Sequence, residues 1–117
     1  MDYLVREVGP VTVIDLDGEL FQRQCTDLEQ LIARLAREEG MLLLLNLAAV
    51  RSVCSTSLHL LVHWHRQLAE NGGSMVLCSV PGAIGRALQA TRLDELLAIY
   101  PSEPVALAAM GAAPAKA

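Results

Sequence analysis

LLLLNLAAVRSVCSTSLHLLV, residues 42–62, joins an uninterrupted apolar run to three hydroxyl residues (Ser55, Thr56 and Ser57) and then to a second apolar pattern. The first run does not alternate between apolar and polar residues, so it predicts a central strand covered on both faces. The second pattern has helical spacing and ends at Gly72-Gly73, which predicts a helix that begins at the hydroxyl residues. The buried stripe of this helix is expected to consist of Leu58, Leu61, Val62, Leu68 and Ala69.

Two strand-like segments open the chain. Residues 3–8 and 11–18 are both strand-like, and Gly9-Pro10 lies between them as a turn. This pattern predicts an N-terminal hairpin, and Gly18 is expected to end its second strand.

A helix is predicted over residues 26–40, between the hairpin and the central strand. Thr26 is its expected N-cap, Glu29 completes a capping box three residues later, and Gly40 supplies the stop. One face of this helix is apolar, with Leu28, Leu31, Ile32 and Leu35 at helical spacing.

The last third of the chain repeats the alternation of strand and helix. The sequence predicts strands over 74–80 and 96–100 and helices over 83–91 and 102–110, with Ser102 capping the last helix. The predicted order is ββαβαβαβα, an α/β fold whose sheet is mostly parallel and is made mixed by the opening hairpin. Residues 1–110 are expected to form one domain, followed by a flexible tail over 111–117.

Composition excludes several classes of function. The 117 residues are 53% apolar and 3% aromatic and carry a net charge of −4, with no basic stripe, so nucleic-acid binding is not expected. The longest apolar run, residues 41–45, is too short to cross a bilayer. No basic segment precedes an apolar one at the N-terminus, so no signal peptide is expected and the predicted location is the cytoplasm.

The cysteine and histidine residues do not form a metal-binding motif. Cys25, Cys54 and Cys78 contain no Cys-x-x-Cys pair, which favours reduced, buried thiols over a zinc site. His59 and His63 are four residues apart, but the glutamate of the zinc-protease motif is missing, so both are predicted to lie on a solvated helix face. His65 falls within the apolar stripe and is expected to be partly buried with a hydrogen-bonded ring. No metal or other cofactor is predicted.

Enzymatic activity is not expected. No Gly-x-Ser-x-Gly elbow surrounds Ser55, and no glycine-rich phosphate loop follows any predicted strand. A more distant alternative is a ligand-binding or catalytic site that uses Cys54, His59 and His63, because Cys54 precedes a helix start, where a thiolate is favoured.

The order of elements and three stretches resemble the STAS domain, the fold of bacterial anti-sigma factor antagonists. The stretches are VTVIDLDGEL (11–20), residues 42–62 quoted above, and residues 68–107, which contain the Gly-Gly turn and the strand that ends Leu-Cys-Ser-Val. The resemblance covers residues 3 to about 110 and implies a STAS-type fold.

The resemblance also implies a function. Members of this family bind an anti-sigma factor that is a serine kinase, and a serine in the signature after the central strand accepts phosphate. Laid along this chain, that serine is Ser55. The implied partner-binding residues are Asn46, Cys54, Ser55, Thr56, Ser57 and His59.

Four positions depart from the family signature. Asn46 and Cys54 replace aspartates, Ser57 replaces a glycine, and Phe21 stands where an aspartate often follows Gly-Glu-Leu. These departures leave open an alternative: STAS domains also serve as unphosphorylated subunits of ABC-type lipid transport systems, where they contact the ATPase. In a third interpretation Ser55 is a plain helix cap without a switch. Exposed edge strands would also allow a homodimer.

Overall fold

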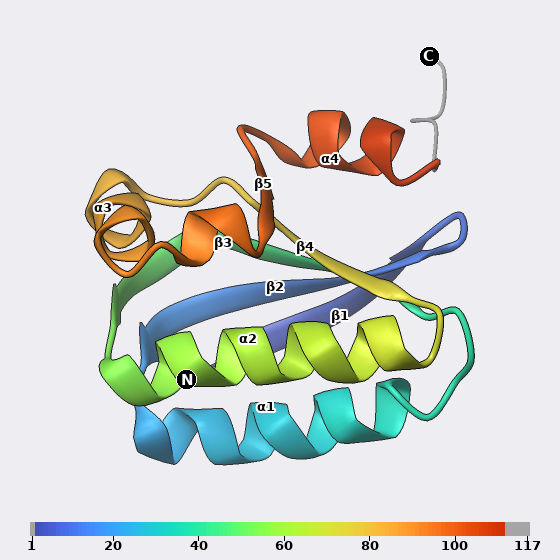
Figure 1. Cartoon of the computed structure of the whole chain (residues 1–117), viewed down its shortest axis with the longest axis horizontal. Helices are drawn as coiled ribbons and strands as arrows, with labels where there is room; N and C mark the ends of the chain where they lie inside the picture. Colours follow the sequence, from blue (N-terminus) through green and yellow to red (C-terminus); the bar gives the residue numbers. More distant parts are fainter. Residues whose placement is uncertain (1, 112–117) are drawn as a thin grey trace.

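One five-stranded sheet forms the centre of the structure, a computed structural model that describes residues 2–111 (Figure 1). Apart from Gly111, the predicted tail lies outside these residues. The elements along the chain are β1 (Asp2–Val8), β2 (Val11–Leu20), α1 (Gln22–Leu35), β3 (Leu42–Val53), α2 (Ser55–Glu70), β4 (Ser74–Cys78), α3 (Gly82–Ala90), the 3-10 helix η1 (Leu93–Glu95), β5 (Ala98–Tyr100) and α4 (Glu103–Ala109). Apart from the added η1, this confirms the predicted ββαβαβαβα order.

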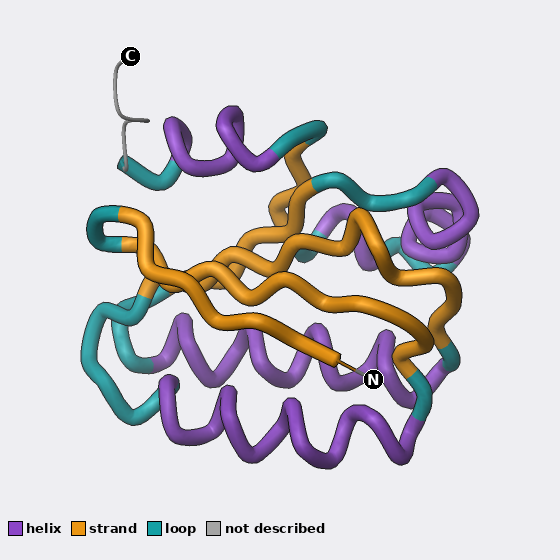
Figure 2. The backbone as a smooth tube through the Cα atoms, turned by 180° about the vertical axis from the view of Figure 1, so that it is seen from behind, coloured by secondary structure: helices purple, strands orange, loops and turns teal. Residues whose placement is uncertain are grey.

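The strands lie in the order β1-β2-β3-β4-β5. The β1–β2 hairpin is antiparallel and the other pairs are parallel, so the sheet is mixed and mostly parallel, as predicted. Helices α1 and α2 lie side by side against one face, and α4 lies on the other face (Figures 1 and 2). The uninterrupted apolar run in β3 therefore has helices on both sides, which explains why it does not alternate.

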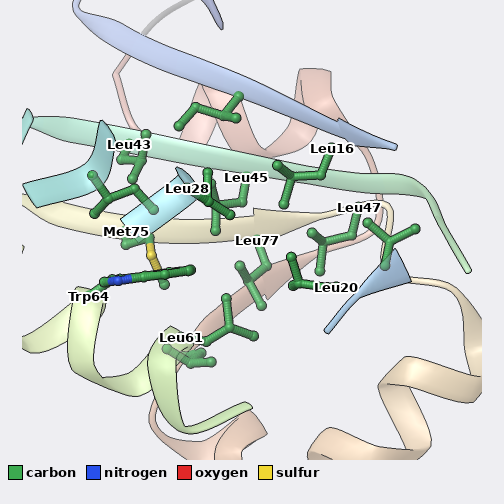
Figure 3. Close-up of a cluster of buried hydrophobic side chains, with 14 of the residues drawn as sticks. Leu16, Leu20, Leu28, Leu43, Leu45, Leu47, Leu61, Trp64, Met75 and Leu77 are labelled. Atoms are coloured by element: carbon green, nitrogen blue, oxygen red, sulfur yellow. The ribbon is translucent and has the colours of Figure 1, made fainter. Parts of the chain in front are cut away.

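The larger core lies between the sheet and helices α1, α2 and α3. Leu45 and Leu77 point into it from the sheet, and Leu61 and Trp64 enter it from α2 (Figure 3). Trp64 is fully buried and lies beside Met75. This core supplies most of the apolar burial that stabilises the fold.

A smaller core lies beneath α4. Val13, Leu44 and Val76 contribute to it from the sheet, and Ala106 and Leu107 from the helix. Because α4 spans only seven residues, it covers this face only in part.

Arg6 on β1 fastens α4 to the sheet. Its guanidinium donates to both carboxylate oxygens of Asp15 on β2, at 2.6 and 3.0 Å, and to both oxygens of Glu103 on α4, at 2.6 and 3.3 Å. The three side chains are between 24 and 35% exposed, so the charges are partly screened by solvent. The cluster adds a polar link where the apolar contact is small.

The prediction that Gly18 ends its strand is wrong. Strand β2 continues to Leu20 and keeps pairing with β3 as far as Val53. The register shifts between Gly18 and Glu19, and Gly18 has a φ of +107°. Gly18 therefore marks a β-bulge, which absorbs the irregularity without ending the pairing.

Both predicted ends of the first helix are also wrong. Helix α1 begins at Gln22, with Phe21 as N-cap, because buried Cys25 extends the apolar stripe one turn before Leu28. Thr26 therefore lies inside the helix, on its exposed side. The helix ends at Leu35, and a turn connects it to β3 through Gly40, whose φ is +74°.

The buried stripe of α2 differs from the prediction at one position. Leu58, Leu61 and Leu68 are buried and Val62 is half-buried, but Ala69 is exposed. Trp64 takes its place in the stripe, because helical spacing from Leu61 and Leu68 places that side chain on the same face.

Among residues 2–111, the helices are all too short or too polar to cross a membrane.

Candidate functional site

Ser55 is the first residue of α2 and is exposed to solvent. Only Cys54 separates it from the end of β3, so the strand and the helix fix its backbone on both sides. Its hydroxyl lies at the positive end of the helix dipole, and the first turn of α2 contains no acidic residue. The site therefore combines an accessible alcohol with a local field that favours negative charge.

Cys54 and Ser57 form a capping box that holds this helix end. Cys54 is the N-cap, and its backbone N–H donates to Ser57 Oγ at 2.9 Å. The Ser57 hydroxyl donates in turn to the Cys54 carbonyl at 2.7 Å, and the Ser57 backbone N–H donates to Cys54 Sγ. Ser57 is fully buried and Thr56 is half-buried. Of the three hydroxyl residues, only Ser55 is exposed.

The same hydrogen bonds change the acidity of Cys54. The bond from the Ser57 backbone N–H lowers the pKa of the half-buried Cys54 thiol, with a smaller contribution from the Ser57 hydroxyl. Burial raises the pKa of Cys25 to about 11 and also raises that of Cys78. Cys25 and Cys78 are free and buried, as predicted, whereas Cys54 is free but only half-buried, and it alone has its thiolate favoured.

Phe21 lies at the same end of the molecule, next to this site. The N-termini of α1 and α2 lie side by side (Figure 1), and the Cys54 thiol donates to the carbonyl of Leu20, the residue before Phe21, at 3.9 Å. The Phe21 side chain is 38% exposed. It extends the polar surface around Ser55 with an apolar group that was not among the predicted partner-binding residues. The sequence does contain a feature that indicates Phe21. It is an apolar residue between a strand and a helix, and neither element needs it to complete its own buried face.

Asn46 is not grouped with Ser55. It lies within β3, seven residues before the end of that strand at Val53, a separation of about 23 Å at the usual strand rise. Its amide donates to Asp15 Oδ1 at 3.0 Å, and its Oδ1 accepts the backbone N–H of Ala48 at 3.0 Å. Asn46 thus belongs to the Arg6–Asp15–Glu103 cluster, where a neutral donor complements the Asp15 carboxylate.

The histidines occupy the two predicted kinds of environment. His59 lies one helical turn after Ser55 on the same exposed side of α2, and His63 lies a turn further along. Within residues 2–111, the His, Cys, Asp and Glu side chains form no cluster able to hold a metal ion. His65 is partly buried, as predicted, and its buried Nδ1 has no hydrogen-bond partner among the described residues.

Comparison with known proteins identifies the family and the fold. The STAS domain family matches residues 2–106. An anti-sigma-factor antagonist (STAS) domain protein from Planctomyces limnophilus is 28% identical, with a TM-score of 0.78 over 95% of this chain and 99% of that one. An anti-sigma factor antagonist from Mycobacterium paratuberculosis is 27% identical, with a TM-score of 0.83 over 92% of each chain. The Bacillus cell fate determinant SpoIIAA in its phosphorylated form, 17% identical, shares the fold with a TM-score of 0.75 over 93% of this chain and 99% of that one.

Proposed function

The chain belongs to the STAS domain family, and from this premise we propose that it is a non-catalytic regulatory module resembling the anti-sigma factor antagonists. Its partner in this proposal is a serine kinase-type anti-sigma factor, which it binds through the surface around Ser55. Phosphorylation of Ser55 by that partner dissociates the complex.

The observation that carries this proposal is the different placement of three adjacent hydroxyl groups. Ser57 is buried and caps the helix, Thr56 is half-buried, and Ser55 is exposed on a backbone held by the capping box. A kinase can reach Ser55 without unfolding the helix. The cap does not depend on the Ser55 hydroxyl, so this side chain is available for modification.

Electrostatics explains how phosphate would act as a release signal. A phosphoserine carries about −1.5 to −2 charges, which the positive end of the α2 dipole stabilises within this chain. A docked partner, in contrast, would have to desolvate a dianion inside a contact built for a neutral alcohol. The expected effect is loss of binding with little change in the fold.

Two positions around Ser55 lack the acidic residue of the family signature. Cys54 and the exposed Phe21 occupy positions where the family signature has aspartate. Because the Phe21 ring is exposed here, the contact with the partner would depend on burial of apolar surface more than on ion pairs.

The test uses the full chain, ATP and a serine kinase-type anti-sigma factor from the same genome. Phosphate mapped by mass spectrometry is expected on Ser55, to be absent in Ser55→Ala, and to remain at Ser55 in the control Thr56→Val. Binding of Ser55→Asp to the partner is expected to be at least about tenfold weaker than that of the wild type, equivalent to about 1.4 kcal/mol.

Two results would separate the parts of this proposal. An unmodified Ser55 together with unchanged binding of Ser55→Asp contradicts the switch. Failure to bind any such kinase, with capture of an ABC-type ATPase in its place, contradicts the partner assignment and supports the alternative in which a STAS subunit of a lipid transporter acts without phosphate.

A further inference from the structure

Strand β1 forms an edge of the sheet and has exposed apolar side chains on both of its faces. Tyr3, Leu4 and Val5 are 41, 60 and 40% exposed, and they are three of the six large apolar residues with exposed side chains among those described. Edge strands are usually protected by charges, bulges or a covering element. β1 pairs regularly with β2 over its whole length, without a bulge, and its other edge is open (Figure 2).

The hairpin determines which backbone groups of β1 face outward. Val8 and Val11 flank the two-residue loop and form its closing hydrogen-bonded pair. Because the direction of the N–H and C=O groups alternates along a strand, those of Leu4 and Arg6 also point toward β2. The N–H and C=O groups of Tyr3, Val5 and Glu7 therefore point away from the sheet and can bond a further strand.

We propose that β1 pairs antiparallel with β1 of a second copy of this chain, about a two-fold axis at Val5. This register brings all seven residues of the strand (Asp2–Val8) into one ladder. Each outward-facing residue then meets an outward-facing one: Val5 meets Val5, and Tyr3 meets Glu7 of the second copy. The ladder contains about six intermolecular hydrogen bonds and joins two sheets into one.

Charge also favours this register. Tyr3 lines a groove against α1 together with Arg34, Arg37 and Asp27, so the groove has a net positive charge. Both arginines are exposed, and the ion pairs among the described residues involve neither of them.

Glu7 lies toward the opposite end of β1 from Tyr3, and this end is acidic. It lines a hollow with Glu38 and Glu39. In the antiparallel pair this acidic end of one copy meets the groove of the other, and the two-fold axis repeats the contact. The strand is thus complementary to itself, which favours a second copy over an unrelated peptide.

The experiment measures the dissociation constant of the dimer of the full chain by sedimentation equilibrium. The monomer has a mass of 12.6 kDa. A dimer is expected for the wild type. Val5→Lys and Val5→Glu each place two like charges on the two-fold axis and are each expected to weaken association at least about tenfold. An equimolar mixture of the two variants places lysine opposite glutamate and is expected to restore the dimer. Val105→Lys changes a residue of similar exposure on α4, 45%, and is expected to leave association unchanged.

Hydrogen exchange of the wild type tests the same register without a substitution. The amides of Tyr3, Val5 and Glu7 are expected to gain protection as protein concentration rises, while those of Leu4 and Arg6 are protected at every concentration. A monomer at all concentrations up to about 1 mM overturns the proposal, as does a Val5→Lys variant that associates like the wild type or a mixture that stays monomeric. None of these outcomes depends on Ser55 or on an anti-sigma factor, so the proposed function is tested separately.

Discussion

Three consecutive hydroxyl residues at the start of α2 differ because each step along a helix turns the side chain by about 100°. Ser57 turns inward and bonds the N-cap, Thr56 lies at the boundary, and Ser55 faces solvent. The sequence predicted a helix start at this cluster and singled out Ser55. It did not indicate that Cys54 would be the N-cap, since cysteine is not a preferred capping residue. Nor did it separate Asn46 from the site, because its side-chain partner Asp15 lies on another strand.

The first prediction separates capping from exposure. Ser57→Ala removes the acceptor for the Cys54 N–H inside the protein and is expected to lower the free energy of unfolding by about 1–2 kcal/mol. Ser55→Ala, which removes an exposed hydroxyl, is expected to change it by less than about 0.5 kcal/mol. Urea unfolding of both variants makes the comparison. Equal losses would show that the Ser57 hydroxyl does not stabilise this end of the helix.

The second prediction concerns the cysteines. Hydrogen bonds from Ser57 lower the pKa of Cys54, so its thiolate fraction at neutral pH exceeds those of Cys25 and Cys78. Iodoacetamide is expected to alkylate Cys54 first, with a rate that rises with pH and levels off below pH 9, the ordinary pKa of a cysteine. Mass spectrometry of a time course locates the label. Alkylation of Cys25 as fast as Cys54 in the folded protein would contradict the assignment.

At the scale of the elements, apolar patterns predicted every strand and every α-helix, but not the 3-10 helix η1, and several boundaries were wrong. Thr26 and Glu29 match a capping box, yet α1 starts earlier because Cys25 is buried against the core, and packing outweighs a local cap. Gly18 was expected to end a strand, but the pairing of Leu20 with Val53 continues past it. In both cases the deciding partner is distant in sequence, so a local pattern could not show it.

The turns after α1 and α2 lock together, which gives the third prediction. Gly40 N–H donates to the Asn71 carbonyl, and a Cβ on Gly73 would lie 2.1 Å from the carbonyl oxygen of Met41. Gly73→Ala therefore forces the two turns apart, with an expected loss of about 3 kcal/mol or more in unfolding free energy.

The neighbouring glycine is the matched control. Gly72 has a φ of +78° but open space around it, so Gly72→Ala is expected to cost only the backbone strain, about 1–2 kcal/mol. Thermal unfolding of both variants shows which substitution lowers stability more. A Gly72→Ala loss equal to or larger than that of Gly73→Ala would contradict the steric argument.

On the scale of the whole molecule, the two faces of the sheet are covered unequally. The face under α1, α2 and α3 carries the larger core, and the face under α4 carries a small one supplemented by Arg6, Asp15 and Glu103. Opening of α4 alone would expose little apolar surface. Local unfolding is therefore expected to begin there.

The fourth prediction links this cluster to pH. The bond from Arg6 lowers the pKa of Asp15 below its ordinary value of 3.8, so the folded protein favours the carboxylate. The resulting stabilisation is present above pH 3.8 and is lost as pH falls through the lowered pKa of the folded state. Arg6→Met is expected to lower stability by about 1–2 kcal/mol at neutral pH, a range that allows for solvent screening.

Urea unfolding at a series of pH values from neutral to below pH 3 measures the gap in unfolding free energy between the wild type and Arg6→Met. The gap is expected to shrink at the acid end. Arg66→Met, which alters an exposed arginine on α2, serves as the control and is expected to show a small gap at every pH. An Arg6→Met gap that stays constant into acid would rule out an ionic origin.

The two borders of the sheet differ in length. Seven residues form β1, whereas β5 has only three, Ala98–Tyr100, and is followed by Pro101, which has no amide hydrogen to donate. In the proposed dimer, pairing through β1 occupies the long edge strand of each sheet. The remaining edge strand, β5, is too short to pair with a further molecule in the same way. Such growth therefore stops at a closed pair, and the protein is protected from polymerising into fibres by the same unequal ends.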